Sequence, residues 1–213
     1  MRPDRAVRGA SLSGERAAWE TAFADALRRG DPLAASTILR DTGRKGWVKR
    51  AELVRARGVV DDEIHPAPLV RRDWATRLLA HPRRVDKELA AQLLLALTRT
   101  HQRDVERAAL RLARDDEREV RETAAALLGA ALDDAFDAYL PTVRDWVATG
   151  DSRARRAAVV AAKLAVRPRH PERLVSVREL VEAARGDADE YVARAVRSAT
   201  RKIEGRGPRL SAA

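Results

Sequence analysis

A short motif that recurs along the chain restricts the fold more than any other feature of the sequence. Each copy starts with Val or Ala and continues with basic and small residues that favour a helix. The copies start at intervals of 37, 35, 34 and 38 residues, at Val48, Val85, Val120, Ala154 and Val192. Acidic turn residues precede the later copies, at Asp115, Asp116, Asp151 and Asp187. Helical pairs repeated in this way are typical of HEAT-like solenoids, although the period here is a little shorter than their usual length of about 40–47 residues.

Composition supports the same fold class. Ala, Leu, Arg and Glu dominate, and only 4% of the residues are aromatic, so the sequence favours closely packed helices over a sheet. The tetratricopeptide repeat has a period of about 34 residues, but its Trp, Leu, Gly and Tyr pattern is absent. We therefore predict an all-α, HEAT-like α-solenoid (ARM/HEAT superhelix) of about five helical pairs plus an N-terminal helix. We expect one repeat domain over 13–205, between a disordered basic lead (1–12) and a disordered tail (206–213).

Turn residues and apolar periodicity predict where the helices lie. Residues 58–68 contain two prolines and three acids without a helical period, so we expect a loop there that ends the preceding helix at Gly58. Ser152 is the expected cap of the arginine-rich helix, and Val70, Trp74, Leu78 and Leu79 are the expected buried side of an earlier one. The expected helices cover 13–29, 31–42, 45–57, 69–80 and 85–98, followed by the pairs 102–114 with 116–132, 134–149 with 151–166, and 171–185 with 187–204.

Charge indicates the class of partner. The chain has 42 Lys and Arg against 32 Asp and Glu, a net charge of +10, which favours an anionic partner and above all nucleic acid. A composition that is generally rich in Arg and Ala would also raise the number of basic residues, even in a protein that does not bind nucleic acid. In a solenoid the second helix of each pair lines the concave surface, so cations at related positions (Arg50, Lys87, Arg121, Arg155 or Arg156, Arg194) could follow a phosphate backbone. The candidate nucleic-acid-binding residues are Arg121, Arg153, Arg155, Arg156, Arg194, Arg197 and Lys202.

A structural interpretation of these arginines stays open beside the functional one. An Arg at this place in a HEAT-like repeat often pairs with an aspartate between the helices, here Asp116, Asp151 or Asp187. A scaffold that holds an acidic protein segment in the same groove is the main alternative to DNA binding, and RNA binding is a third interpretation.

The C-terminal half resembles a known family. The segment Asp151-Ser-Arg-Ala-Arg-Arg-Ala-Ala-Val-Val, with Asp-Glu-Tyr-Val at 189–192, is similar to the HEAT-like DNA alkylation repair proteins, the AlkD-type alkylpurine DNA glycosylases. The resemblance covers roughly the last 90 residues. It implies that a concave face binds duplex DNA, that Arg155 or Arg156 contacts a phosphate, and that 3-methyladenine or 7-methylguanine is excised.

The aromatic positions of that family are not matched. Arg153 and Ser198 stand where the family has tryptophans, and 115–121 offers Asp116, Glu117 and Glu119 without an aromatic residue. An aromatic and carboxylate pair stabilises the cationic base and the developing positive charge on the sugar. The sequence therefore leaves open an active glycosylase with a rearranged pocket or a relative that binds without cutting.

Other chemistry is poorly supported by the sequence. The chain has no cysteine, which excludes disulfides and thiolate sites and is compatible with a reducing cytoplasm. No apolar run approaches the roughly 18 residues that span a bilayer. We expect a cytoplasmic monomer without cofactor, metal or membrane. Surface or capping roles are expected for His65, His81, His101 and His170, and core roles for Trp74 and Trp146, each of which follows an aspartate.

Overall fold

Helices account for nearly all of the ordered secondary structure. The computed structural model describes residues 17–43, 48–64, 67–166 and 170–205; the predictions for 1–12 and 206–213 lie outside these ranges. Within them no strand occurs, so the all-α prediction is confirmed there. The helices are α1 (Ala18–Arg28), α2 (Pro32–Asp41), α3 (Arg50–Ile64), α4 (Pro68–Ala80), α5 (Arg84–Leu94), α6 (Gln102–Ala113), α7 (Arg118–Asp134), α8 (Phe136–Thr149), α9 (Ser152–Ala165), α10 (Leu174–Ala183) and α11 (Glu190–Glu204), with short 3-10 helices η1 (Leu95–Leu97) and η2 (Pro171–Arg173).

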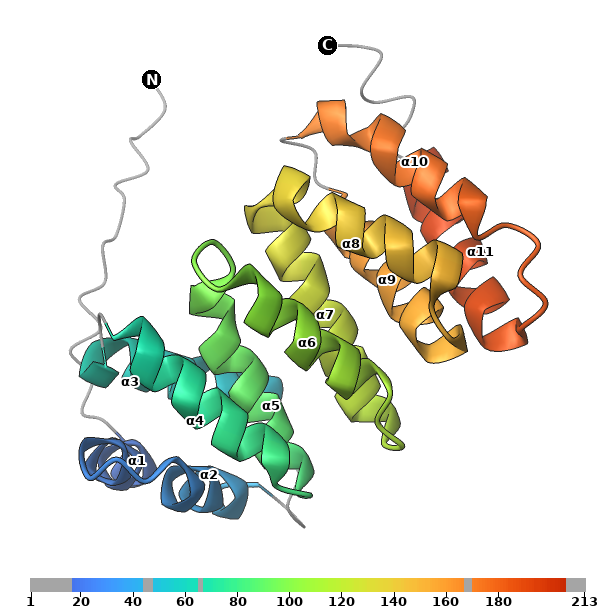
Figure 1. The fold of residues 1–213 in the computed structure, drawn as a ribbon. Helices are drawn as coiled ribbons and strands as arrows, with labels where there is room; N and C mark the ends of the chain where they lie inside the picture. The colour runs from blue at the N-terminus through green and yellow to red at the C-terminus, as the bar shows by residue number, and fades with distance from the viewer. Residues whose placement is uncertain (1–16, 44–47, 65–66, 167–169, 206–213) are drawn as a thin grey trace, which may run out of the picture.

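Four successive helix pairs form the larger part of the molecule (Figure 1). In each pair the two helices pack against each other: α4 with α5, α6 with α7, α8 with α9, and α10 with α11. The second helices also pack on one another, α5 on α7, α7 on α9, and α9 on α11. Figure 1 shows the first helices α4, α6, α8 and α10 on the near side and the second helices behind them. Each helix thus buries its apolar side against its partner in the pair and against the neighbouring pairs.

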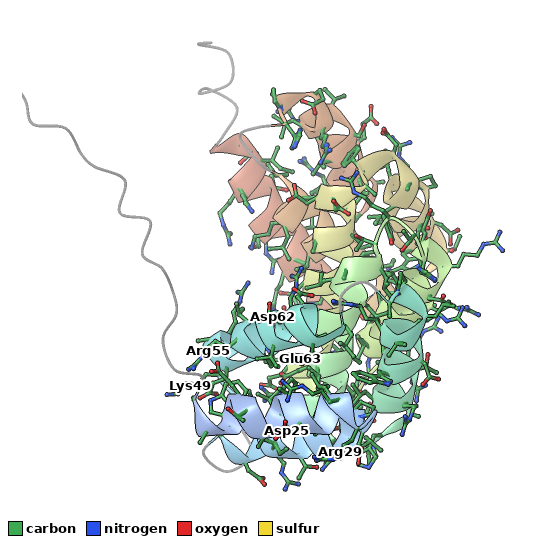
Figure 2. All side chains as sticks on the ribbon, turned by 90° about the vertical axis from the view of Figure 1, so that its left-hand side faces the viewer. Asp25, Arg29, Lys49, Arg55, Asp62 and Glu63 are labelled. Atoms are coloured by element: carbon green, nitrogen blue, oxygen red, sulfur yellow. The ribbon has the colours of Figure 1, made fainter. Side chains whose placement is uncertain are left out.

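The N-terminal helices are arranged differently from these pairs. α1 packs against both α2 and α3, and α3 in turn packs on α5. Arg28 of α1 donates two 2.8 Å hydrogen bonds to the carboxylate of Glu63, and Arg55 of α3 donates a 2.6 Å hydrogen bond to Glu20. Figure 2 shows α1 and α3 side by side, with Arg55 and Glu63 labelled on α3.

α2 docks on α5 through a buried polar contact. Asp31 caps α2, because its side chain accepts a 3.0 Å hydrogen bond from the N–H of Ala34. Ser36 and Asp86 are both 0% exposed, and the Ser36 hydroxyl donates a hydrogen bond to the Asp86 carboxylate. Arg83 donates a further 2.8 Å hydrogen bond to Asp86. These donors satisfy a carboxylate that burial alone would strongly disfavour.

The predicted loop at 58–68 is wrong, because α3 continues through Gly58 to Ile64. Val59 and Val60 are 5% and 1% exposed, so packing of this segment outweighs the cost of about 1 kcal/mol that a glycine imposes inside a helix. The carboxylate of Asp61 accepts a 2.7 Å hydrogen bond from Arg71, which ties the end of α3 to α4. On α4, Val70 is exposed rather than buried as predicted.

Small side chains allow α7 and α9 to approach closely. Six of the seven buried residues of α9 are alanines, and α7 contributes the buried Gly129. A Cβ atom added at Gly129 would lie 2.9 Å from Cβ of Leu164 and 3.2 Å from the carbonyl oxygen of Ala161. The helix backbones therefore meet at a distance that only glycine permits at this position.

We predict that Gly129→Ala lowers the free energy of unfolding by about 1–3 kcal/mol, because the added methyl group forces α7 and α9 apart. The matched control is Gly58→Ala, also inside a helix but with nothing within 4 Å of the added Cβ. It should raise the free energy of unfolding by about 0.5–1 kcal/mol. Urea denaturation followed by circular dichroism measures both, and equal effects in the two variants would contradict the close approach.

Candidate nucleic-acid interface

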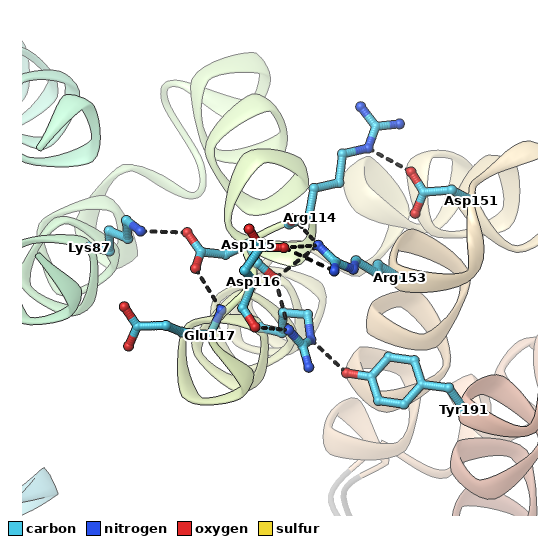
Figure 3. Close-up of polar contacts among 9 residues, drawn as sticks. Lys87, Arg114, Asp115, Asp116, Glu117, Asp151, Arg153 and Tyr191 are labelled. Carbon is cyan, nitrogen blue, oxygen red and sulfur yellow. Dashed lines mark hydrogen bonds and ion pairs between the residues drawn. The ribbon is translucent and has the colours of Figure 1, made fainter. Parts of the chain in front are cut away.

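The turn between α6 and α7 is bound by a lysine from the preceding pair (Figure 3). Its first carboxylate, Asp115, accepts a 2.6 Å hydrogen bond from Nζ of Lys87 on α5 and a 3.0 Å hydrogen bond from the N–H of Glu117. Burial by itself raises the pKa of Asp115, but these hydrogen bonds and the Lys87 charge bring it below its ordinary value of 3.8. Asp115 is therefore ionised at neutral pH and ties α5 to the next turn.

Arg153 binds the other side of the same turn. From the start of α9, its guanidinium donates a 2.5 Å hydrogen bond to the carbonyl of Arg114 and 3.1 Å hydrogen bonds to the carboxylate of Asp116. Arg114 in turn donates a 2.7 Å hydrogen bond to Asp151. Asp151 also accepts a 2.9 Å hydrogen bond from the N–H of Ala154, so Asp151 caps α9 in place of the predicted Ser152. Two reciprocal contacts thus join adjacent turns.

Arg155 links α9 to the turn of the following pair, as Lys87 does for α5. Its guanidinium donates hydrogen bonds of 2.6 and 3.2 Å to the two oxygens of Asp187, in the turn before α11, and one of 2.7 Å to the carbonyl of Gly150. The hydrogen bond from Arg155 is the main cause that holds the pKa of Asp187 below its ordinary value of 3.8. The side chain of Arg155 is 27% exposed, so most of it is used in this junction.

Arg121 and Arg156 meet at Tyr191. Arg121 donates a 2.9 Å hydrogen bond to the Tyr191 hydroxyl and hydrogen bonds of 2.9 and 2.6 Å to the carbonyls of Asp115 and Asp116. The guanidinium carbon of Arg156 lies 4.4 Å from the centre of the Tyr191 ring, within cation–π distance. Arg156 also donates a hydrogen bond to the carboxylate of Glu122. This half-buried aromatic group therefore links α7, α9 and α11.

The candidate residues on α11 have a different environment. Arg194 and Arg197 are 74% and 54% exposed and share one carboxylate, that of Glu190, at 3.1 and 2.7 Å. Arg201, which the prediction did not include, continues the same helix face and has no carboxylate within ion-pair distance among the described residues. Lys202 donates a 2.7 Å hydrogen bond to the carbonyl of Lys163 and so supports the contact of α11 with α9.

The predicted set therefore divides into two groups. The four arginines of α7 and α9 form hydrogen bonds within the protein, and two of them pair with inter-helix aspartates as the structural interpretation expected: Arg153 with Asp116 and Arg155 with Asp187. On α11, Arg194 and Arg197 remain largely exposed. Lys202 belongs to the first group by its contact with α9.

The positive excess of the chain lies mostly outside the described residues. Ten of the 42 basic residues but only two of the 32 acidic residues fall in 1–16, 44–47, 167–169 and 206–213. The described residues therefore contain 32 basic and 30 acidic side chains. A nearly balanced helical body can present a basic surface only where its charges are unevenly distributed.

Two of the tryptophans and the described histidines occupy supporting positions, and His65 lies outside the described residues. Trp74 and Trp146 are 6% and 7% exposed and belong to the core, as predicted. His81 follows the last residue of α4 and lies 2.6 Å from Asp86, and His101 and His170 precede α6 and η2. Across the described part of the chain, no group of three or more His, Asp or Glu side chains is placed to hold a metal ion.

The prediction missed a row of arginines on α6. Arg103, Arg107 and Arg111 are exposed and lie four residues apart, so they share one face of the helix. Arg107 pairs with Asp104 at 2.5 Å, whereas Arg103 and Arg111 have no carboxylate within ion-pair distance in the described ranges. The spacing Arg-x-x-x-Arg-x-x-x-Arg is visible in the sequence, but α6 is a first helix, and the concave-face argument considered second helices alone.

We predict that Asp187→Asn lowers the free energy of unfolding by about 1–2 kcal/mol at pH 7, because Arg155 loses its charged acceptor. The lowered pKa of Asp187 means that its stabilisation is present above pH 3.8 and is lost as pH falls through its folded value. The difference between wild type and variant, measured by urea denaturation, should therefore disappear in strong acid. Asp73→Asn, at an exposed position, is the control and should change little at either pH; a pH-independent deficit in Asp187→Asn would contradict the ionic link.

Comparisons with known proteins add no family to this description. No family model, curated protein or solved structure matches the chain. Among the helices that the structure describes, none combines the length and the apolar character needed to cross a membrane.

Proposed function

We propose that the protein is a HEAT-like helical-repeat protein that binds the backbone of duplex DNA, with the exposed arginines of α11 as its principal contacts. The observation that carries this proposal is the exposed row of Arg194, Arg197 and Arg201, in which Arg194 and Arg197 share the carboxylate of Glu190 and Arg201 has no carboxylate within ion-pair distance among the described residues. Seven residues of helix span about 10 Å, a length over which one DNA strand presents about three phosphates. The sequence continues with two further arginines, Arg206 and Arg209.

The position of α11 explains why its arginines are available. Lys87 and Arg155 each bind an aspartate in the turn of the following pair. No further helix pair follows α11 in the described chain, so Arg194 has no corresponding carboxylate ahead of it and pairs with Glu190 of its own helix. Exposed guanidinium groups with few competing carboxylates suit phosphate contacts, because binding releases counterions without breaking many internal pairs.

Support for the HEAT-like part of the proposal comes from the helix pairs. Four pairs follow one another with their second helices in contact, and the linked turns recur at related positions. This arrangement supports the helical repeat that the sequence suggests. The proposal includes DNA binding and leaves out base excision, because Trp74 and Trp146 are buried and the half-buried Tyr191 is occupied by Arg121 and Arg156.

The proposal predicts that replacing Arg194, Arg197 and Arg201 together by Gln weakens duplex binding about tenfold or more at low salt. It should also reduce the slope of log affinity against log salt by about 2–3, since each phosphate contact contributes about 0.9. Fluorescence anisotropy with a labelled duplex, from roughly 50 to 200 mM salt, measures both quantities.

The control variant replaces Arg144, Arg178 and Arg185 by Gln, which removes the same charge from α8 and from α10 and its C-terminal turn. It should leave the salt slope nearly unchanged. Equal losses in the two triple variants would show that net charge alone attracts DNA, and a flat salt dependence in the wild type would reject nucleic-acid binding. Incubation with duplex containing N3- or N7-methylpurine tests the remaining part, and release of free base would show that excision belongs to the function.

A further inference from the structure

A groove between α4 and α6 combines an apolar floor with a basic rim. It lies on the face of the first helices, where Figure 1 shows α4 and α6 beside each other, and none of its lining residues belongs to α9 or α11. Leu79 and Leu94 contribute to the floor, and the volume is about 280 Å³. Pockets that enclose a drug-sized ligand have about 300–1,000 Å³, so this groove has room for one or two apolar side chains.

Three arginines surround the floor, and one carboxylate faces them. Arg72 is 48% exposed and Arg107 is 78% exposed, and Arg111 completes the rim from the next turn of α6. Asp104 lies 4.0 Å from Arg72 and 2.5 Å from Arg107. Arg111 has no carboxylate within ion-pair distance among the residues that the structure describes. The groove thus carries an excess of two positive charges above a floor of largely buried side chains, of which Leu79 is 8% and Leu94 2% exposed.

We infer that this groove binds an acidic segment of a partner protein, with an apolar side chain on the floor and flanking carboxylates on Arg72, Arg107 and Arg111. Arginine binds carboxylates through two parallel hydrogen bonds, which gives both charge complementarity and orientation. Protein interfaces commonly place apolar groups at the centre and polar groups at the rim. A nucleic-acid backbone would use the arginines but has no group that requires the leucine floor. This inference does not depend on DNA binding by α11.

The test uses the full chain and a short fluorescein-labelled peptide in which a leucine is flanked by glutamates. Fluorescence anisotropy should detect saturable binding to the wild type. Replacing the leucine of the peptide by serine, or its glutamates by glutamines, should weaken binding about tenfold in each case, because the floor and the rim act together. Loss of binding from the glutamine peptide alone would show simple charge attraction and would overturn the assignment of the groove.

Charge reversal on one helix provides the matched variants. Arg111→Glu changes the rim, whereas Arg103→Glu makes the same charge change on α6 outside the groove. We expect Arg111→Glu to weaken peptide binding at least tenfold and Arg103→Glu less than threefold. Arg72→Glu on the opposite rim gives a second variant with the same expected loss, and thermal unfolding by circular dichroism identifies any variant that does not fold.

Three results would overturn the proposal. They are no binding of the acidic peptide, equal loss in Arg111→Glu and Arg103→Glu, and displacement of the peptide by an unlabelled DNA duplex that no longer binds Arg111→Glu. The last result would assign the groove to nucleic acid. Selective loss in Arg72→Glu and Arg111→Glu, with no competition by the duplex, would support the acidic segment.

Discussion

The close packing of α7 on α9 is the constraint on which the arrangement of the other helix pairs depends. Gly129 leaves no room for a Cβ beside Leu164 and Ala161, and the buried side of α9 is almost entirely alanine. Small side chains bury little apolar area each, but they let two helix backbones approach and make many dispersion contacts. The buried hydrophobic residues form one continuous cluster through all helix pairs, so the spacing at this central contact affects the pairs on both sides.

This side-by-side packing also determines what the basic residues do. When second helices lie next to one another, the turn that begins each helix comes within reach of a long side chain from the preceding helix. Lys87 uses this geometry to bind Asp115, and Arg155 uses it to bind Asp187. The junction between α7 and α9 is an exception. There Arg114 binds Asp151, whereas Arg121 of α7 donates a hydrogen bond to Tyr191. The basic residues of the repeated motif therefore serve mainly to connect each helix pair to its neighbour.

Sequence reasoning predicted the positions of the helix pairs from residue 68 onward well, because apolar periodicity and turn residues are strong local signals. Asp151 and Asp189 cap α9 and α11, whereas the sequence predicts Ser152 as the cap of α9. The turn signals failed at Gly58, where Val59 and Val60 pack into the core and hold the helix together across a residue that usually ends one. Local signals could not predict this, since the stabilising contacts come from elements distant in the sequence.

The site was less predictable than the fold for a related reason. A sequence shows that an arginine lies on a helix, but its availability depends on which carboxylate the tertiary structure brings near it. Arg153 and Arg155 have such carboxylates, whereas Arg103 and Arg111 have none within ion-pair distance in the described part of the chain.

The order of the helix pairs explains why arginines are available on α6 and α11. The second helices α5 and α9 each lie beside the acidic turn of the next pair, so Lys87 and Arg155 bind the aspartates of these turns. α6 is a first helix that packs mainly against its own partner α7, and α11 faces no further pair in the described chain. Basic residues on these two helices therefore keep hydrogen-bonding capacity for an external anion. In a chain whose described residues are nearly balanced in charge, the location of the acidic turns determines where a cationic surface can form more than the number of arginines does.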